Sequence, residues 1–188
     1  MKLAQRVGRI QPSPTMAMAA RAKALAAQGI EVIDFGVGEP DFDTPDAIKD
    51  AAIAAIKAGF TKYTPPSGTD ELKQAIIRRL ETDQGLRYQP NEIVVSCGAK
   101  HTLYNLAQAL FEQDDEVLIP APYWVSYPDQ VLLNDATPIF VPTRAENGFA
   151  LDPRQLESAI TPRTKALILN SPSNPTGTMI APAEMRAI

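Results

Sequence analysis

Residues 93–119 decide the fold; they read IVVSCGAKHTLYNLAQALFEQDDEVLI. The short apolar block Ile93–Ser96 predicts a buried strand. It is followed by a longer stretch, Lys100–Phe111, which predicts a helix, and by a second short apolar block, Val117–Ile119. Because a strand, a helix and a second strand in this order form the repeating unit of a parallel sheet, the stretch indicates an α/β fold.

The same alternation continues to the end of the chain. It predicts a mostly helical stretch at residues 124–133, a strand at 138–141, a helix at 153–160, a strand at 166–169 and a helix from Pro182 onward. Four such units predict right-handed crossovers and a mostly parallel sheet that helices cover on both faces. Ligands of such sheets bind at the carboxyl ends of the strands.

The N-terminal part predicts mainly helices. Residues 16–28 and 69–83 have helical patterns, and residues 30–35 predict a short strand. Between them, Thr44 is expected to cap a helix that has Pro45 at its first position and ends before Gly59. Most of the 17 prolines fall between the predicted elements and separate them.

Composition limits the function. The chain has 188 residues, a length that corresponds to one domain or to one domain and part of a second. Hydrophobic residues make up 45% of it, which is enough to form a core. The net charge of −4 gives no basic surface for nucleic acid or an anionic membrane. The single cysteine, Cys97, fits a reducing compartment, and the single histidine, His101, excludes a histidine-rich metal site. We therefore expect a cytoplasmic globular protein without a metal centre.

Three loops that follow predicted strands carry residues suited to a ligand. Ser96–Thr102 joins small residues to a helix start, which favours an anion such as phosphate; the alternative is an ordinary strand-to-helix turn. Pro120–Pro128 holds three aromatic residues, of which Trp124 offers a face to a planar ligand; the alternative is core packing. Asn170–Thr178 is a rigid proline-containing loop that would hold an asparagine amide as a donor; the alternative is a simple turn.

These loops are expected to share one edge of the sheet because they follow parallel strands. An anion site, an aromatic face and an amide donor together describe a pocket for a planar, phosphorylated cofactor. A fourth loop, Gly36–Pro45, contains Gly38, which allows a ligand to approach the backbone closely; the alternative is turn chemistry. We expect His101 to cap or pack and Cys97 to be a small buried residue.

The loop Asn170–Gly177, NSPSNPTG, resembles the signature loop of the class I aminotransferases, which use pyridoxal 5′-phosphate. The resemblance is strongest to the bacterial aspartate (aspartate/prephenate) aminotransferase group. It extends in the family's order through Gly36–Pro45, Lys62–Pro65, Cys97–Lys100 and Pro122–Pro128. The resemblance implies an α/β protein of pyridoxal-phosphate fold type I.

The resemblance also implies a domain organisation and cofactor contacts. Residues 1–45 correspond to an N-terminal arm and a small-domain segment, and residues 46–188 to the N-terminal, incomplete part of the cofactor-binding large domain. Gly98, Ala99 and Lys100 match the turn that binds the cofactor phosphate in the family. Trp124 matches the aromatic residue that stacks on the pyridine ring. Asn174 matches the residue whose amide donates to the ring's phenolic oxygen.

Further positions match substrate and subunit contacts. Gly38 matches the loop at the substrate carboxylate, and Trp124 and Asn174 also face the substrate. Tyr63 matches a tyrosine that reaches the cofactor phosphate of the partner subunit, which implies a homodimer. Where Gln11 stands, close relatives carry a lysine that is associated with prephenate recognition, so Gln11 argues against this substrate.

The family's Schiff-base lysine, its aspartate beside the pyridine nitrogen and its arginine for the substrate carboxylate all follow the signature loop. The resemblance therefore implies that they lie beyond Ile188. We expect the chain to contain no catalytic residue of this kind, to be the N-terminal part of an aminotransferase and to be inactive alone.

The parent activity that this implies is transfer of an amino group between an amino acid, aspartate or another dicarboxylate, and a 2-oxo acid. Two alternatives remain open. One is a lyase or synthase on the same fold, because a fold does not fix a reaction. The other is a non-catalytic fragment or regulatory binding module.

Overall fold

The computed structural model describes residues 2–10, 12–34, 36 and 38–188. Gln11, and Phe35 at the end of the strand expected at residues 30–35, lie outside the described residues. The chain divides into two compact units: unit 1 is Met1–Ile30 with Leu103–Ile188, and unit 2 is Glu31–Thr102. The domain boundary expected after residue 45 stays a prediction.

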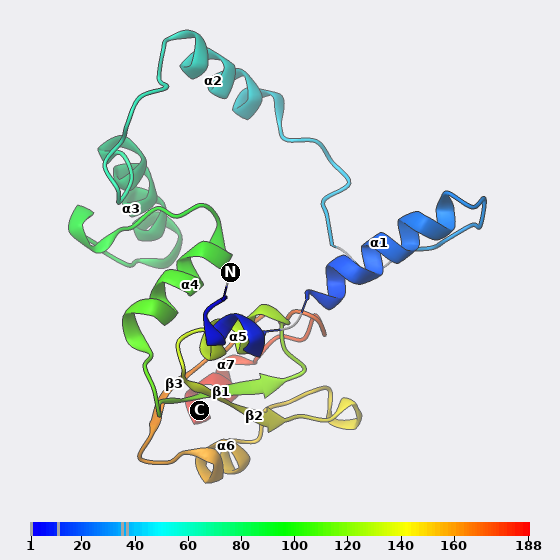
Figure 1. The fold of residues 1–188 in the computed structure, drawn as a ribbon. Helices are drawn as coiled ribbons and strands as arrows, with labels where there is room; N and C mark the ends of the chain where they lie inside the picture. The colour runs from blue at the N-terminus through cyan, green and yellow to red at the C-terminus, as the bar shows by residue number, and fades with distance from the viewer. Residues whose placement is uncertain (1, 11, 35, 37) are drawn as a thin grey trace. The chain divides into compact units, whose positions relative to one another are not determined.

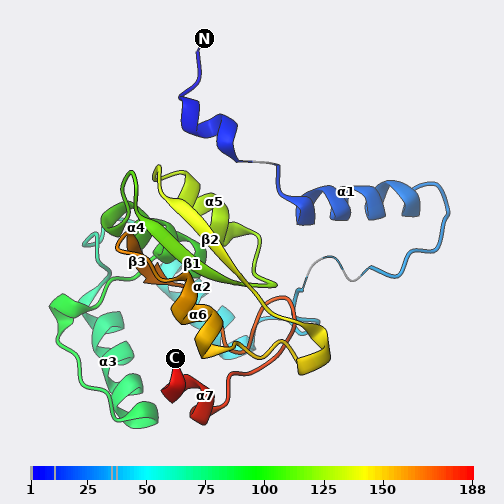
Figure 2. The same cartoon turned by 90° about the horizontal axis from the view of Figure 1, so that it is seen from below.

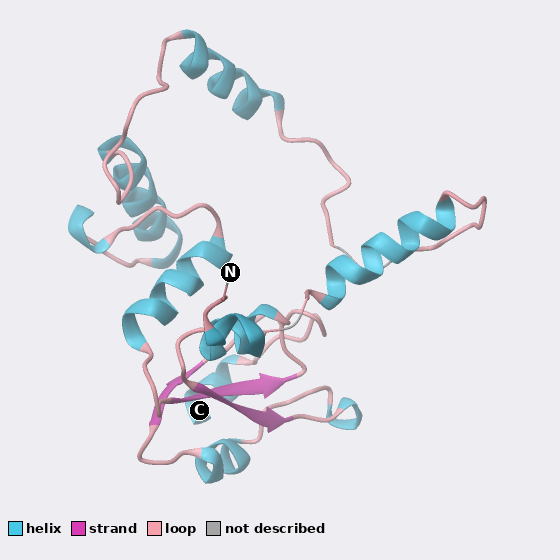
Figure 3. Cartoon of the chain, viewed as in Figure 1, coloured by secondary structure: helices cyan, strands magenta, loops and turns pink. Residues whose placement is uncertain are grey.

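Unit 1 is built around a parallel sheet. Strand β1 (Glu116–Ala121) lies between β2 (Thr137–Pro142) and β3 (Thr164–Leu167), as Figure 3 shows in magenta. Leu118 of β1 pairs with Ile139 of β2 and Leu167 of β3. Both pairings are parallel, which confirms the predicted α/β fold with a parallel sheet.

Apart from three short 3-10 helices, the helices of the described residues begin and end within two residues of the predicted bounds. In unit 1 they are η1 (Gln5–Arg9), α1 (Pro14–Ala26), α5 (Ser126–Leu132), η3 (Ala145–Asn147), α6 (Pro153–Ala159) and α7 (Pro182–Ala187). In unit 2 they are α2 (Asp46–Lys57), α3 (Asp70–Gln84) and η2 (Pro90–Glu92). Helix α4 (Ala99–Leu110) begins in unit 2 and continues into unit 1. The short 3-10 helices η1, η2 and η3 were not predicted. Figures 1 and 2 give two views of these elements.

The central strand β1 is buried on both faces. Successive side chains of a strand point to opposite faces. Val117 and Ile119 pack with Val131 of α5, whereas Leu118 packs with Leu156 of α6. Helices therefore cover both faces of the sheet, as the sequence predicts. All five side chains are at most 4% exposed, so this contact forms the core of unit 1.

An ionic cluster fixes the beginning of β1. Thr161 donates its hydroxyl to Oε2 of the buried Glu116 at 2.6 Å, and Arg163 Nε donates to Oε1 at 2.8 Å. The hydrogen bonds from Thr161 and Arg163 lower the pKa of Glu116 below its ordinary value of 4.5. Because both partners lie directly before β3, the cluster connects β1 to the segment that enters the neighbouring strand.

Two predicted strands are not formed. Residues 30–34 and Ile93–Ser96 are not strands in the described part of the chain. Ile93 has extended backbone angles, φ −112° and ψ 127°, and the Val95 N–H donates to the Ser67 carbonyl at 2.9 Å. A strand is defined by pairing along its length, and this single hydrogen bond does not make residues 93–96 a strand.

The helix cap predicted at Thr44 is also wrong. Helix α2 begins one residue later than predicted, with Pro45 in the capping position and no side-chain cap. The Pro45 carbonyl accepts from the N–H groups of Ile48 and Lys49. Because Pro45 is extended, at φ −53° and ψ 139°, it stands outside the helix, and Thr44 is one residue too far away to cap it. Within the described ranges, the structure contains no helix that is long and apolar enough to cross a membrane.

Candidate functional site

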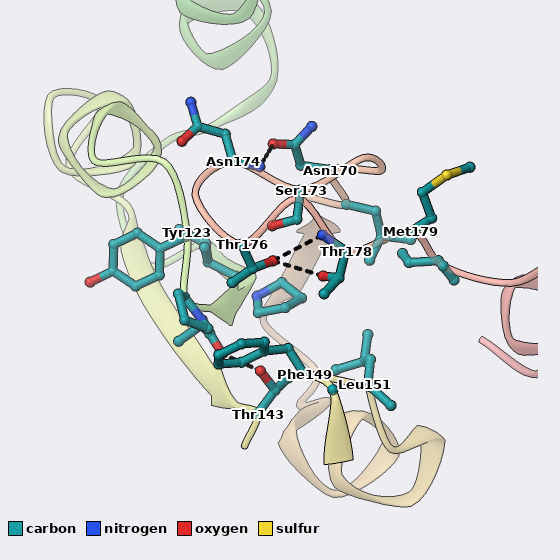
Figure 4. Close-up of a pocket in the computed structure, with 18 of the residues that line it drawn as sticks. Tyr123, Thr143, Phe149, Leu151, Asn170, Ser173, Asn174, Thr176, Thr178 and Met179 are labelled. Atoms are coloured by element: carbon teal, nitrogen blue, oxygen red, sulfur yellow. Dashed lines mark hydrogen bonds between the residues drawn. The ribbon is translucent and has the colours of Figure 1, made fainter. Parts of the chain in front are cut away.

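A cavity of about 190 Å³ lies at the carboxyl end of the sheet in unit 1. Its walls come from the end of β1 and residues up to Tyr123, from Thr143 and residues 147–151 after β2, and from residues in 168–180 after β3 (Figure 4). Loops after all three strands therefore meet at one edge. This arrangement confirms the expectation that the loops after β1 and β3 lie together.

The asparagine-rich loop after β3 is held by its own side chains. Asn170 Oδ1 accepts from the Asn174 N–H at 2.9 Å (Figure 4), and Asn170 Nδ2 donates to the Pro172 carbonyl at 3.1 Å. One amide therefore uses its acceptor and a donor to fix the loop from both sides. The Asn174 amide itself is exposed and extends away from Thr176 and Thr178 in Figure 4.

The second half of this loop closes on itself. The Ser173 N–H donates to the Thr178 carbonyl, and the Gly177 N–H donates to the Ser173 carbonyl, both at 2.8 Å. The hydroxyls of Thr176 and Thr178 are hydrogen-bonded at 2.7 Å. Gly177 has φ +73°, a left-handed conformation that favours glycine. The rigid path that the two prolines predict is therefore reinforced by backbone and hydroxyl contacts.

The aromatic residues after β1 divide between the cavity and the core. Tyr123 lines the cavity and stacks on Phe140, with ring centroids 4.8 Å apart. Trp124 is half-buried and meets the buried Tyr127 edge to face, with centroids 5.3 Å apart and an interplanar angle of 83°. Trp124 also packs against the core around Val117. Among the described cavity walls Trp124 does not appear, so its stacking on a ligand stays a prediction.

The loop after β2 was missed as a wall of the site. Thr143 donates its hydroxyl to the Ala121 carbonyl at 2.7 Å, which ties this loop to the end of β1. Phe149 and Leu151 then line the cavity. The sequence contained the information needed to predict this wall, because the loop follows the predicted strand at residues 138–141 and therefore belongs at the same carboxyl edge of the sheet.

The predicted phosphate turn lies in unit 2. Gly98 has φ +87° and immediately precedes α4, and its N–H donates to the Ser96 carbonyl at 2.8 Å. The Cys97 N–H donates to Nδ1 of His101 at 3.2 Å, which confirms a local capping role for His101. Cys97, expected to be buried, is exposed because it lies on the turn itself.

The remaining predicted positions, Gly38 and Tyr63, also lie in unit 2. Both are exposed, and the Tyr63 side chain has a relative exposure of 108%. A Cβ atom at Gly38 would meet nothing within 4 Å. The structure thus shows Asn174 at the cavity of unit 1 and Gly38, Tyr63, Gly98, Ala99 and Lys100 in unit 2, and their roles stay predictions.

The cavity chemistry suits the ring of pyridoxal phosphate better than its phosphate. The walls offer amides and hydroxyls from Asn170, Asn174 and Thr176 beside the Tyr123 and Phe149 rings. Glu184 is the charged residue among the described walls, and a carboxylate repels a phosphate. The donor set therefore fits a planar ring with a polar oxygen, whereas the described walls carry no positively charged side chain for a phosphate.

The parallel sheet, with helices on both faces and loops that meet at its carboxyl edge, defines a protein of the α/β class. Residues 30–188 match the family model "Aminotransferase class I and II". The chain belongs to this family, whose members depend on pyridoxal 5′-phosphate.

Curated relatives match the chain along its whole length. It is 53% identical to the aspartate aminotransferase of Geobacillus stearothermophilus over 188 residues, which are 48% of that protein. It is also 53% identical to the aspartate/prephenate aminotransferase of Nitrosomonas europaea, of which it covers 47%. The chain thus spans about half the length of the curated relatives it matches.

Solved structures agree. The aspartate aminotransferase of Thermus thermophilus with maleate superposes with a TM-score of 0.95 at 43% identity, covering 100% of this chain and 49% of that one. The aspartate aminotransferase of Rhizobium meliloti gives a TM-score of 0.93 at 45% identity, covering 100% and 47%.

Proposed function

We propose that the chain is the N-terminal half of a pyridoxal-phosphate-dependent aminotransferase that moves an amino group between aspartate, or another dicarboxylic amino acid, and a 2-oxo acid. The observation that carries this proposal is the loop Asn170–Gly177 at the carboxyl edge of the sheet, where it lines a cavity of about 190 Å³. Identity of 53% to an aspartate aminotransferase along the whole chain supports the same reaction class.

The chain's own residues bind and orient the cofactor in this proposal. The turn Gly98–Lys100 holds the phosphate with backbone N–H groups at the start of α4, where the helix dipole favours an anion. Trp124 packs on the ring, and Asn174 donates its amide to the ring oxygen. The cofactor, when bound, supplies an electron sink for the amino-acid carbon.

Gly38 and Tyr63 contribute substrate and subunit contacts in this proposal. Gly38 lets the backbone approach the substrate carboxylate, because it carries no side chain. The exposed Tyr63 reaches the phosphate of the cofactor bound to a second subunit, so the active protein is a homodimer. We further propose that it acts in the cytoplasm.

The proposal is tested by extending the reading frame past codon 188 and assaying the complete protein. We expect amino transfer from aspartate to 2-oxoglutarate, and a loss of activity in Asn174→Ala that the exposed control Asn91→Ala does not show. A complete protein that binds pyridoxal phosphate but eliminates or condenses its substrate would identify a lyase or synthase instead. A genuine stop after Ile188, with cofactor-free protein, would favour a non-catalytic module.

A further inference from the structure

Among its described residues, unit 2 contains one buried charged side chain that the proposed function does not use. Lys73, in the first turn of α3, is 7% exposed. Its Nζ donates to the Ser67 hydroxyl at 2.5 Å. Burial of an ammonium group is unfavourable unless it is hydrogen-bonded. In the described part of the chain its ammonium pairs with this hydroxyl and with no carboxylate.

Ser67 is a junction between two segments. While its side chain accepts from Lys73, its carbonyl accepts from the Val95 N–H at 2.9 Å. Gly68 packs on Val95: a Cβ atom built on Gly68 would lie 2.6 Å from Cγ2 of Val95. The backbone at 67–68 therefore fits directly against Val95, and only glycine permits this approach.

The two segments that meet at Ser67 carry the two predicted phosphate contacts. Ser67 ends the loop that contains Tyr63, four residues earlier. Val95 lies three residues before Gly98, in the segment that leads into α4. Lys73, Ser67 and Val95 thus join the base of the Tyr63 loop to the base of the 98–100 turn, and all of these residues belong to unit 2.

We propose that Lys73 is a positioning residue for cofactor phosphate binding: by holding Ser67, it sets the Tyr63 loop relative to the turn Gly98–Lys100. This inference rests on the proposed function, in which the turn holds the phosphate of its own subunit and Tyr63 that of the partner. The Lys73–Ser67 contact then couples the phosphate contacts made on the two sides of one dimer.

The test is a double-mutant cycle on the complete protein with pyridoxal phosphate affinity as the readout, measured by fluorescence titration of the apoprotein. We expect Lys73→Met to weaken binding about tenfold, the effect of losing one hydrogen bond to a charged group. Ser67→Ala, a smaller change, should weaken it in the same direction. Lys73→Arg should restore most of the affinity because it keeps a charged donor, and the exposed control Arg78→Met on the same helix should have no effect.

The cycle separates positioning from a purely structural role. If Lys73 acts through Tyr63, then Lys73→Met adds little to the loss caused by Tyr63→Phe. Full additivity of the two losses, or a lower melting temperature with unchanged affinity in both Lys73→Met and Ser67→Ala, would overturn the inference while leaving the proposed function intact. A wild-type complete protein that does not bind pyridoxal phosphate would overturn both.

Discussion

The backbone N–H of Asn174 donates to Oδ1 of Asn170 at 2.9 Å, so the asparagine assigned to the cofactor ring is positioned by the asparagine four residues before it. The same Asn170 side chain donates to the Pro172 carbonyl. Removal of this amide therefore releases the loop at two points without touching the proposed ligand contact itself.

We predict that Asn170→Ala lowers kcat/KM of the complete protein by about 10- to 100-fold, because two hydrogen bonds that hold the loop are lost. Asn170→Asp keeps the acceptor for Asn174 and loses the donor to Pro172, so its loss should be smaller. Steady-state kinetics with both variants measure this order. Equal losses in the two variants would show that the Asn174 contact does not position the loop.

The cluster at Glu116 predicts a pH-dependent stability. Thr161 and Arg163 lower the pKa of Glu116 in the folded protein, so the unfolded chain binds a proton at higher pH than the folded chain. The stabilisation is therefore present above pH 4.5 and is lost as the pH falls through the folded-state pKa. Arg163 is largely exposed, which weakens its ionic contribution.

Thermal melts of the apoprotein from about pH 6 to about pH 3 test this dependence. The difference in melting temperature between wild type and Glu116→Gln should shrink as the pH falls. Glu157→Gln, at an exposed position on α6, is the control and should track the wild type. A constant difference across this range would mean that the Glu116 charge does not stabilise β1.

The close contact at Gly68 predicts a strong effect of a single methyl group. In Gly68→Ala the new Cβ atom would lie 2.6 Å from Val95 Cγ2, and φ is +103°. In the control Gly85→Ala φ is +69° and nothing lies within 4 Å of the Cβ atom, so only backbone strain applies. Gly68→Ala should lower the free energy of unfolding by about 1–3 kcal/mol more than Gly85→Ala, as measured by urea denaturation. Equal effects would contradict the packing of Gly68 on Val95.

The isolated 188-residue chain should not bind pyridoxal phosphate covalently. The resemblance to the class I aminotransferases implies that the lysine that does so follows the segment that this chain matches. We therefore expect no new absorbance band at about 400–430 nm when pyridoxal phosphate is added, and no adduct that survives borohydride reduction. The complete protein is the positive control. A single stable adduct at one lysine of the isolated chain would refute this prediction.

Helices were easier to predict than strands in this chain, for a physical reason. A helix forms most of its backbone hydrogen bonds within its own segment, so local sequence features are enough to define it. In α3 these features are the cap at Thr69 and the apolar spacing, and in α6 the cap at Asp152. A strand needs a neighbour. Val117–Ile119 has two neighbours in this chain, whereas Ile93–Ser96 has the same apolar character and none among the described residues.

The part of the candidate site that depends on the order of strands and loops, namely which loops meet at the carboxyl edge of the sheet, was predictable from the sequence. The loops of Tyr123 and Asn174 meet because they follow parallel strands, and the same rule applies to the loop of Phe149, where it was not used. Whether Trp124 faces a ligand or packs in the core stayed open in the sequence, because its contact with Tyr127 depends on side-chain packing that the sequence pattern does not encode.

The central claim is that the 98–100 turn, Trp124 and Asn174 form one binding site for pyridoxal phosphate. A crystal structure of the complete protein with bound pyridoxal phosphate tests it most directly. The account predicts the phosphate at the turn Gly98–Lys100, the ring against Trp124 and the Asn174 amide on the ring oxygen. A cofactor bound elsewhere, or these three positions on separate sides of the molecule, would contradict it.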